Sequence, residues 1–247
     1  MRVIDARGMH FRELNEQVYN LVQQGETNIV LKNVLGHRYI ADNLRGDNIK
    51  IEIQGVPGND LAAFMDGPTI IVNGNGQDGI ANTMNSGKVV IKGNSGDALS
   101  YGMRGGRLYI KGTAGYRVGI HMKGIESHFP VVIVGRSAGA FFGEYLAGGI
   151  LMVLGLNKPK DEPILRDYIA TGMHGGVIYI RSRDIKEEQI GREVSIFDID
   201  EEDIRYMAPY LKEYAADLDF DFDEIMQGDF VKLMPVSTRP YGKLYVY

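Results

Sequence analysis

The residues Gly74–Gly79 have the spacing of a nucleotide-binding loop, since they read Gly-Asn-Gly-Gln-Asp-Gly after a short apolar run. In a dinucleotide site, such glycines let the backbone approach the pyrophosphate, and a helix begins at the loop. The residues that follow, 80–87, lack a helical pattern. We therefore interpret Gly74–Gly79 as a chain corner in preference to a nucleotide site.

The histidines do not form a metal-binding motif. They show neither the HxH nor the HxxxH spacing that would indicate ligands on one strand or helix. A metal site would have to be assembled from distant parts of the fold, so structural roles are the favoured interpretation. The five histidines are His10, His37, His121, His128 and His174.

Two aspartates and three arginines are the remaining candidates for chemistry. Asp60 and Asp66 could form a glycosidase-like acid/base pair, but both lie in turn signals, which favours turn capping. Arg104, Arg117 and Arg136 could bind an anion, although charged corners are usually solvated. We therefore assign no catalytic, cofactor-binding or metal-binding residue to this chain.

The elements that carry these residues repeat at a regular interval. Seven apolar segments each close in a small residue, at positions 55, 74, 93, 112, 135, 155 and 182, which are separated by 19, 19, 19, 23, 20 and 27 residues. The residues two and four places before each close are aliphatic, so they share one face of a strand. These inward positions are Ile51, Ile53, Ile70, Val72, Val89, Ile91, Leu108, Ile110, Val131, Ile133, Leu151, Val153, Ile178 and Ile180.

The interval indicates the architecture. About 19 residues are too few for a strand–helix–strand unit of ~30, and hairpins would alternate the sense of the pattern. Hexapeptide and leucine-rich repeat signatures are absent. Glycine, at 32 residues, supplies tight corners. We predict a mainly β fold, a single-stranded right-handed parallel β-helix of about seven coils, with insertions near 121–129 and 157–171.

Caps are expected at both ends, because a solenoid otherwise leaves unpaired strand edges. Residues 1–48 are predicted to form an N-terminal cap, with a helix from Phe11 to Val22 and a short strand at 28–31. Residues 49–183 form the β-helix. Residues 184–247 contain a helix with an apolar stripe that includes Ile204 and Leu211, which Pro209 kinks or divides, and an extended tail from Phe230.

The outward positions become apolar toward the C-terminal coils. They begin with Glu52 and Gln54 and reach Val132, Val134, Met152 and Leu154. An exposed apolar stripe of that size is unusual. We expect the C-terminal helix of this chain to cover it, with a partner protein as the alternative.

The composition argues against several classes of site and partner. The chain has no cysteine, which excludes disulfides and thiolate metal sites on it. The net charge of −5 disfavours nucleic acid as a partner. The sequence has neither a signal-peptide pattern at its start nor an apolar run near the ~20 residues of a membrane helix. We expect a cytoplasmic protein with no membrane contact.

An ordered series of motifs along these coils resembles the glycine-rich GXGXG β-helix domain at the C-terminus of the large subunit of glutamate synthase, in the split form where that domain is a separate chain. The resemblance covers essentially the whole sequence, from about Ile4 to the Arg239-Pro240-Tyr241 tail. The motifs that carry it lie at 36–40 (GHRYI), 55–68 (GVPGNDLAAFMDGP), 82–85 (NTMN), 101–106 (YGMRGG), 116–123 (YRVGIHMK), 143–149 (GEYLAGG) and 172–181 (GMHGGVIYIR).

The resemblance implies a subunit without chemistry of its own. Glutamate synthase releases ammonia from glutamine at a glutaminase site and adds it to 2-oxoglutarate at a site with FMN and an iron–sulfur cluster. In that family the β-helix carries neither site and holds the other parts in relation. A glutaminase subunit and an FMN/iron–sulfur synthase subunit are thus the implied partners, and self-association is open. A scaffold in another redox complex, such as formylmethanofuran dehydrogenase, and a solitary β-helix enzyme are the alternatives.

Overall fold

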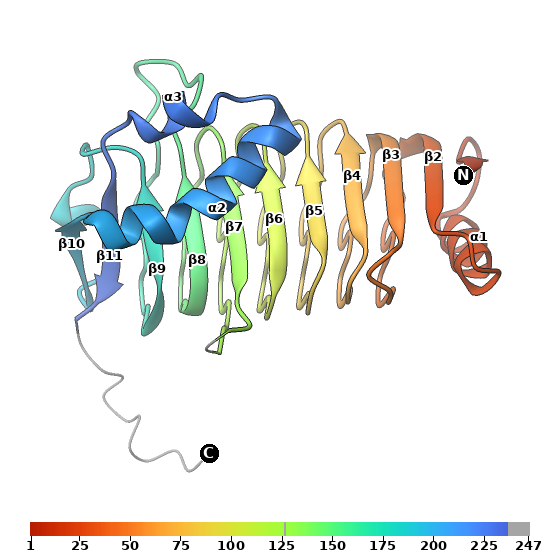
Figure 1. Cartoon of the computed structure of the whole chain (residues 1–247), viewed down its shortest axis with the longest axis horizontal. Helices are drawn as coiled ribbons and strands as arrows, with labels where there is room; N and C mark the ends of the chain where they lie inside the picture. Colours follow the sequence, from red (N-terminus) through yellow and green to blue (C-terminus); the bar gives the residue numbers. More distant parts are fainter. Residues whose placement is uncertain (126, 237–247) are drawn as a thin grey trace, which may run out of the picture.

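The computed structural model describes residues 1–125 and 127–236, and shows an elongated stack of strands (Figure 1). Its one sheet has the order β1-β2-β3-β4-β5-β6-β7-β8-β9-β11-β10, and every pairing from β1 to β9 is parallel. The prediction of a mainly β, parallel β-helix is confirmed. The parallel strands are β1 (Arg2–Asp5), β2 (Asn28–Leu35), β3 (Lys50–Val56), β4 (Thr69–Asn73), β5 (Lys88–Ile91), β6 (Gly106–Ile110), β7 (Pro130–Val134), β8 (Ala147–Val153) and β9 (Gly175–Ile180).

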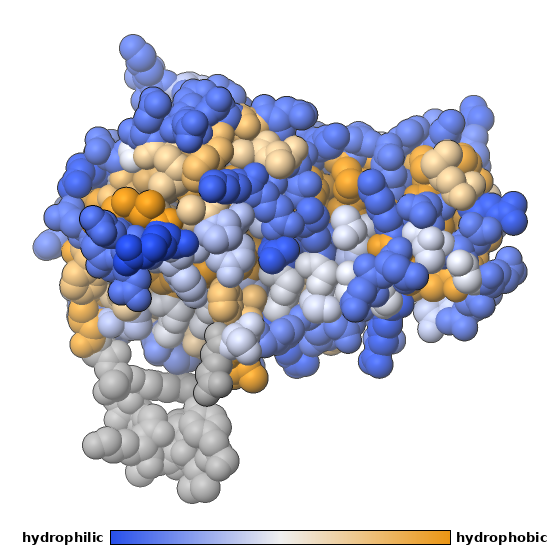
Figure 2. All heavy atoms as spheres, viewed as in Figure 1, coloured by the Kyte–Doolittle hydropathy of each residue, from blue (hydrophilic) through white to orange (hydrophobic). Residues whose placement is uncertain are grey.

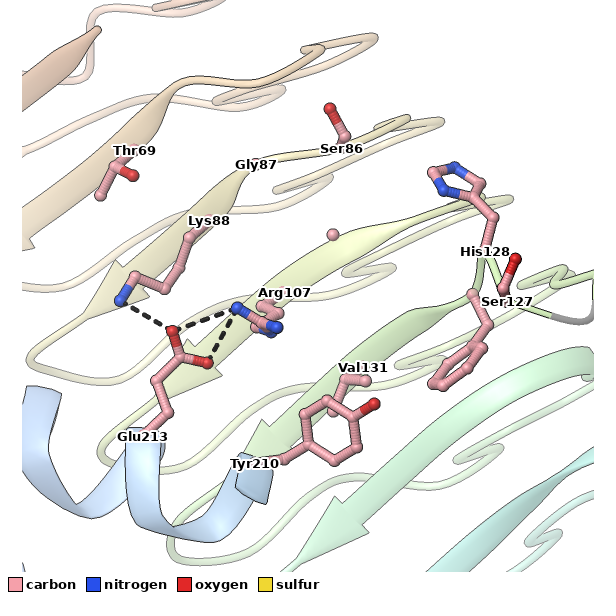
Figure 3. Close-up of a pocket in the computed structure, with 12 residues that line it drawn as sticks. Thr69, Ser86, Gly87, Lys88, Arg107, Ser127, His128, Val131, Tyr210 and Glu213 are labelled. Carbon is pink, nitrogen blue, oxygen red and sulfur yellow. Dashed lines mark hydrogen bonds and ion pairs between the residues drawn. The ribbon is translucent and has the colours of Figure 1, made fainter. Parts of the chain in front are cut away.

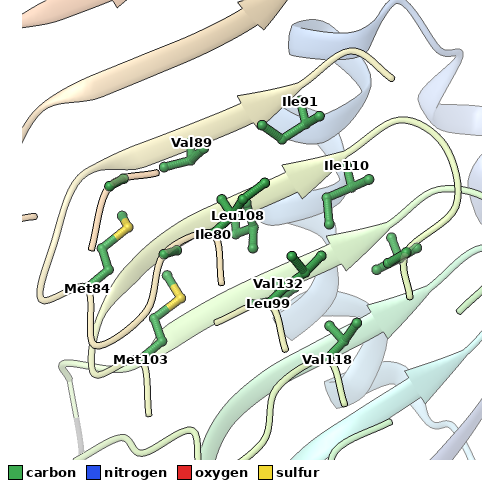
Figure 4. Close-up of a cluster of buried hydrophobic side chains, with 14 of the residues drawn as sticks. Ile80, Met84, Val89, Ile91, Leu99, Met103, Leu108, Ile110, Val118 and Val132 are labelled. Atoms are coloured by element: carbon green, nitrogen blue, oxygen red, sulfur yellow. The ribbon is translucent and has the colours of Figure 1, made fainter. Parts of the chain in front are cut away.

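The inner face of the sheet is a set of aliphatic rows. Strands β3–β9 are the seven predicted segments, and in β3 the inward residues Ile51 and Ile53 are fully buried. Each row continues from coil to coil, as from Ile91 to Ile110 in the register of β5 and β6. Figure 4 shows these rows meeting the side chains from the opposite wall, with Met84 and Met103 below them.

Strand β7 corrects one of the predicted rows. Its register pairs Leu108 with Val132 and Ile110 with Val134, so Val132 and Val134 face the inner core. Val131 and Ile133 face outward instead. The prediction aligned Gly135 with Gly112 and was wrong by one residue here. All five residues of β7 are apolar or proline, so no polar side chain marks the outer face, and a slip of one residue exchanges the two faces.

The wall opposite the sheet is built from residues with positive φ. In each coil three alternate residues take this conformation, as Asp60, Ala62 and Phe64 do with φ of 60°, 59° and 55°. The central residue is small in every coil, and from Ala62 onward it donates its N–H to the previous coil, as Ala81 does to the Leu61 oxygen at 2.9 Å. The central residues are Ala41, Ala62, Ala81, Ser100, Gly119, Gly143 and Ala170.

The glycine-rich corners are held by side-chain amides and carboxylates. Asn75 Oδ1 accepts the N–H of Asn94 at 2.9 Å, and Asp78 Oδ1 accepts the N–H of Asp97 at 2.9 Å. A Cβ atom at Gly93 would overlap the Asn75 side chain, and one at Gly96 would overlap that of Asp78. These corners need glycine because the next coil approaches too closely for any side chain.

Both ends of the stack are closed. Helix α1 (Phe11–Gln23) lies at the N-terminal end, beside β1 and β2, as predicted. Strand β2 pairs in parallel with β3 and so continues the ladder into the segment that was expected to form the cap. At the other end β11 (Val231–Pro235) pairs antiparallel with β9, and β10 (Val194–Asp198) forms the edge. A short 3₁₀ helix, η1 (Glu187–Gln189), precedes β10.

The C-terminal helices lie across the outer face of the sheet (Figure 1). Helix α2 (Glu201–Leu218) continues through Pro209 as a single helix, and α3 (Phe222–Met226) follows it. Proline's missing N–H leaves a gap in the hydrogen-bond pattern but does not divide the helix. The predicted extended tail is β11 as far as Pro235, and its part from 237 to 247 lies outside the described residues.

Candidate functional site

Helix α2 covers the apolar outer stripe of the sheet. Met207, Leu211 and Tyr214 are fully buried against the outward side chains of β6–β9. The expectation that the chain's own helix covers this stripe is therefore met. In the view of Figure 2, apolar side chains gather beside the C-terminal helices, with charged side chains around them. The covered residues include Tyr109, Val131, Ile133, Ile150, Met152, Leu154 and Tyr179.

A buried carboxylate anchors the first turn of α2. Asp203 is 8% exposed and accepts hydrogen bonds from the Tyr179 hydroxyl at 2.8 Å and from Lys232 Nζ at 2.6 Å. Burial raises the pKa of Asp203, but the Lys232, Asp200 backbone and Tyr179 hydrogen bonds outweigh it and leave the pKa below its ordinary value. Ile204, predicted to be part of the buried stripe, is 41% exposed instead.

We expect Asp203→Asn to weaken the protein by about 1–3 kcal/mol at pH 7, because Lys232 loses the nearer of its two carboxylate partners. The pKa of Asp203 is lower in the folded than in the unfolded state, so its stabilisation is present above about pH 4 and is lost as the pH falls through the folded value. Urea unfolding between pH 7 and pH 3 measures this. The variant should lose less stability on acidification than the parent.

Asp198→Asn is the matched control, because Asp198 forms an exposed ion pair with Arg183. Exposed pairs contribute little, so its effect should stay within about 0.5 kcal/mol. Equal stability of Asp203→Asn and the parent at both ends of the pH range would rule out the anchoring role.

The last turns of α2 are tied to β5 and β6 by charge. Glu213 contacts Lys88 Nζ at 3.2 Å and Arg107 Nη1 at 3.1 Å, and it accepts the Tyr109 hydroxyl at 2.8 Å. Lys88 Nζ also lies 2.6 Å from Asp217. Burial, together with the nearby Glu213 charge, raises the pKa of Tyr109 far above its ordinary value. The phenol is therefore a hydrogen-bond donor here, not a base.

A polar hollow of about 490 Å³ opens beside this cluster, between α2, the outer face of β4–β7 and the loop that precedes β7 (Figure 3). Lys88 and Arg107 point toward Glu213, while His128 and Ser127 lie at the far rim. The two cations are thus engaged by the helix, and the charges in this hollow hold α2 on the sheet. Its lining consists of Thr69, Ser86, Gly87, Lys88, Gly106, Arg107, Ser127, His128, Phe129, Val131, Tyr210 and Glu213.

The structure separates the carboxylates and glycines that were weighed as site residues. Gly74–Gly79 is a corner followed by turns and bends, and no helix begins there within 74–87. Asp60 accepts from Asn82 Nδ2 at 3.2 Å on the wall opposite the sheet. Asp66 accepts from Ser86 Oγ at 2.6 Å, where the chain turns into β4. Each carboxylate thus links its own coil to the next.

The histidines have separate surroundings. His10 caps α1, and His37 is buried, with Nδ1 accepting the Leu35 N–H and Nε2 3.1 Å from the Met9 oxygen. His121 stacks on Tyr145, and His174 Nδ1 lies 3.1 Å from the Gly172 oxygen. Across 1–125 and 127–236, no three His, Asp or Glu side chains are placed to hold a metal ion.

Two of the three arginines lie on the wall opposite the sheet. Arg117 Nε contacts Glu144 Oε2 at 2.9 Å, and its guanidinium lies 4.7 Å from the Phe141 ring centroid. Arg104 is exposed, whereas Arg136 is half-buried in the corner after β7. Sequence reasoning did not find the aromatic side chains near Arg117. Phe141 and Tyr168 occupy one position of the repeat and His121 and Tyr145 another, so no single column is aromatic.

The comparison with protein families decides where this chain belongs. The GXGXG motif family matches residues 12–236, which include every strand from β2 to β11. The chain belongs to the GXGXG motif family. This agrees with the domain that the motif series resembles.

This GXGXG protein is similar to a relative in sequence and to a solved structure in fold. The uncharacterized protein MJ1350 of Methanocaldococcus jannaschii is 48% identical over 250 residues, which cover 98% of this chain and 95% of the relative. A chain of the crystal structure of the formyltransferase/hydrolase complex of Methylorubrum extorquens, determined with methylofuran, is 17% identical with a TM-score of 0.58. The match covers 93% of this chain and 89% of that one. This likeness shows a shared fold.

The helices that the structure describes are too short or too polar to span a bilayer.

Proposed function

We propose that this GXGXG protein is a structural, non-catalytic subunit of a glutamate synthase, an enzyme that forms glutamate from glutamine and 2-oxoglutarate. Its role is to organise a glutaminase subunit and a synthase subunit that holds FMN and an iron–sulfur cluster. The observation that carries the proposal is the ordered motif series, which runs through all coils and agrees with the family match over 12–236.

The chemistry of the chain supports this division of labour. With no cysteine, it has no thiolate ligands for a cluster and no cysteine nucleophile for glutaminase chemistry. Lys88, Arg107 and Glu213, the charged groups in the hollow beside α2, are engaged in holding that helix. A long stack of hydrogen-bonded coils is a rigid spacer, because each coil is fixed to its neighbours along its whole length.

Affinity purification of the tagged chain from its native cells, followed by mass spectrometry, tests the proposal. We expect a glutaminase chain and an FMN/iron–sulfur synthase chain to be recovered in stoichiometric amounts. Recovery of molybdenum or tungsten redox subunits would move the chain to a complex of the formylmethanofuran dehydrogenase type and overturn the glutamate synthase assignment. Recovery of no partner at low salt would favour a solitary protein.

A further inference from the structure

The wall opposite the sheet carries a cluster of aromatic rings, here called the back-face aromatic patch, of which all but the half-buried Phe141 are exposed. His121 and Tyr145 stack with centroids 5.0 Å apart, and Tyr101 meets His121 edge-on at 5.9 Å. Phe141 and Tyr168 stack at 4.8 Å. With Tyr116, which is 49% exposed, the patch consists of Tyr101, Tyr116, His121, Phe141, Tyr145 and Tyr168.

The rings of the patch are held rigidly toward solvent. Tyr145, Tyr168 and His121 occupy positive-φ positions of the coil wall, where the backbone is fixed by hydrogen bonds between coils. Tyr145 N, for example, donates to the Thr171 oxygen at 2.8 Å. Aromatic side chains with little freedom to lose are the groups that contribute most at protein interfaces.

The polar groups among the rings already have partners. Glu144 is 8% exposed and pairs with Arg117, whose guanidinium lies against Phe141. The patch therefore offers ring faces and edges to an occupant, with no unpaired carboxylate to desolvate at its centre. The sheet face has a comparable apolar stripe, but α2 covers it, whereas Tyr101, Tyr145 and Tyr168 remain 44–59% exposed.

Two cations border the patch on one side. Arg104 N donates to the Met84 oxygen and Lys123 N to the Met103 oxygen, each at 2.9 Å, so the two residues occupy the same place in consecutive coils. Both are exposed, and neither forms an ion pair with another described residue. A surface of rings beside two cations is complementary to a segment with apolar side chains and carboxylates.

Charge also disfavours one other occupant. The segment 237–247 of this chain contains Arg239 and Lys243 but no aspartate or glutamate, so it would bring cations to cations. Like charges across an interface are unfavourable.

We propose that the back-face aromatic patch docks a segment of a different polypeptide, which presents apolar side chains to the rings and carboxylates to Arg104 and Lys123. The inference rests on the proposed function only for the identity of that polypeptide, which would be the glutaminase or the synthase subunit. The docking itself depends on the geometry and charge of the patch.

Zero-length crosslinking with a carbodiimide tests the docking on the complex purified from native cells through the tagged chain. The reagent joins an amine to a carboxylate in direct contact, so we expect a bond from Lys123 to an aspartate or glutamate of another polypeptide. Lys123→Arg should keep the partner and lose the crosslink. A Lys123 crosslink only to Glu126 of the same chain, or only to a second copy, would overturn the proposal.

Variants separate this inference from the proposed function. Arg104→Glu/Lys123→Glu and Tyr145→Ser should each lower partner recovery at least tenfold, while Lys50→Glu/Lys92→Glu, at exposed positions of the sheet side, should not. Melting temperatures equal to the parent's show that the variants fold. Glutamate synthase subunits recovered equally by all variants would refute the docking and leave the function. A different partner that is crosslinked through Lys123 would refute the function and leave the docking, and recovery of none refutes both.

Discussion

Gly87→Ala should lower the melting temperature by about 10 °C, which corresponds to roughly 3–5 kcal/mol for a chain of this size. Gly87 precedes β5 with a φ of 96°, and a methyl group there would overlap the Pro68 oxygen, which accepts the N–H of Lys88. The substitution thus combines positive-φ strain with a backbone collision. Neither coil can move to relieve the collision without loss of the hydrogen bond from Lys88 N to the Pro68 oxygen. Thermal unfolding followed by circular dichroism measures it.

Gly25→Ala is the control for the strain alone. Gly25 ends the α1 region with a nearly equal φ of 87°, but nothing lies within 4 Å of an added Cβ. Its expected cost is about 1–2 kcal/mol, the price of a left-handed conformation for alanine. If the two variants have the same melting temperature, close approach between coils is not what requires glycine in these corners.

Leu211→Asp should release α2 from the sheet. Leu211 is fully buried against the outer stripe, so its replacement removes about 2–5 kcal/mol of packing and places a carboxylate among apolar groups. We expect the stripe from Val131 to Leu154 to become exposed. The variant should bind a hydrophobic dye such as ANS, aggregate at lower temperature and be cleaved by trypsin within 199–218.

Ala216→Asp introduces the same group on the exposed side of the same helix. Its cost should be limited to helix propensity, about 0.6 kcal/mol. Dye binding, aggregation and trypsin cleavage of Leu211→Asp that match this control would mean that Leu211 does not hold α2 on the stripe.

The rows of the β-helix could be predicted because each coil repeats the same alternation of side chains. Ile51, Ile70 and Val89 align without a gap at 19-residue intervals, and the structure pairs them directly. The alignment failed at β7, where no alternation of polar and apolar residues marks the two faces of the strand. There the glycine at 135 was the only reference, and the chain places it beside Lys111 rather than Gly112.

The opposite wall could not be predicted from the same rules. Most of its positive-φ positions are held by residues other than glycine, as at Tyr39, Ala41 and Asn43. Sequence reasoning associates this conformation with glycine. Hydrogen bonds between coils impose it here, and only the column of small central residues indicates it in advance.

The candidate surfaces show the same division. The apolar stripe and its cover by the C-terminal helix followed from hydrophobic spacing. The sequence pattern did not predict that Asp203, rather than Ile204, lies on the buried side of α2. That placement depends on Tyr179 and Lys232, which come from β9 and β11. The back-face aromatic patch combines six residues between 101 and 168 that occupy different positions in the repeat. It could therefore be recognised only from the three-dimensional structure.

Glutamate formation from glutamine and 2-oxoglutarate, measured with the glutaminase and synthase subunits in the presence and absence of this chain, tests the central claim most directly. A non-catalytic organising subunit should give no glutamate alone and should raise coupled synthesis at least tenfold when it is added to the other two. Equal synthesis with and without the chain, or glutamate production by the purified chain alone, would contradict the account.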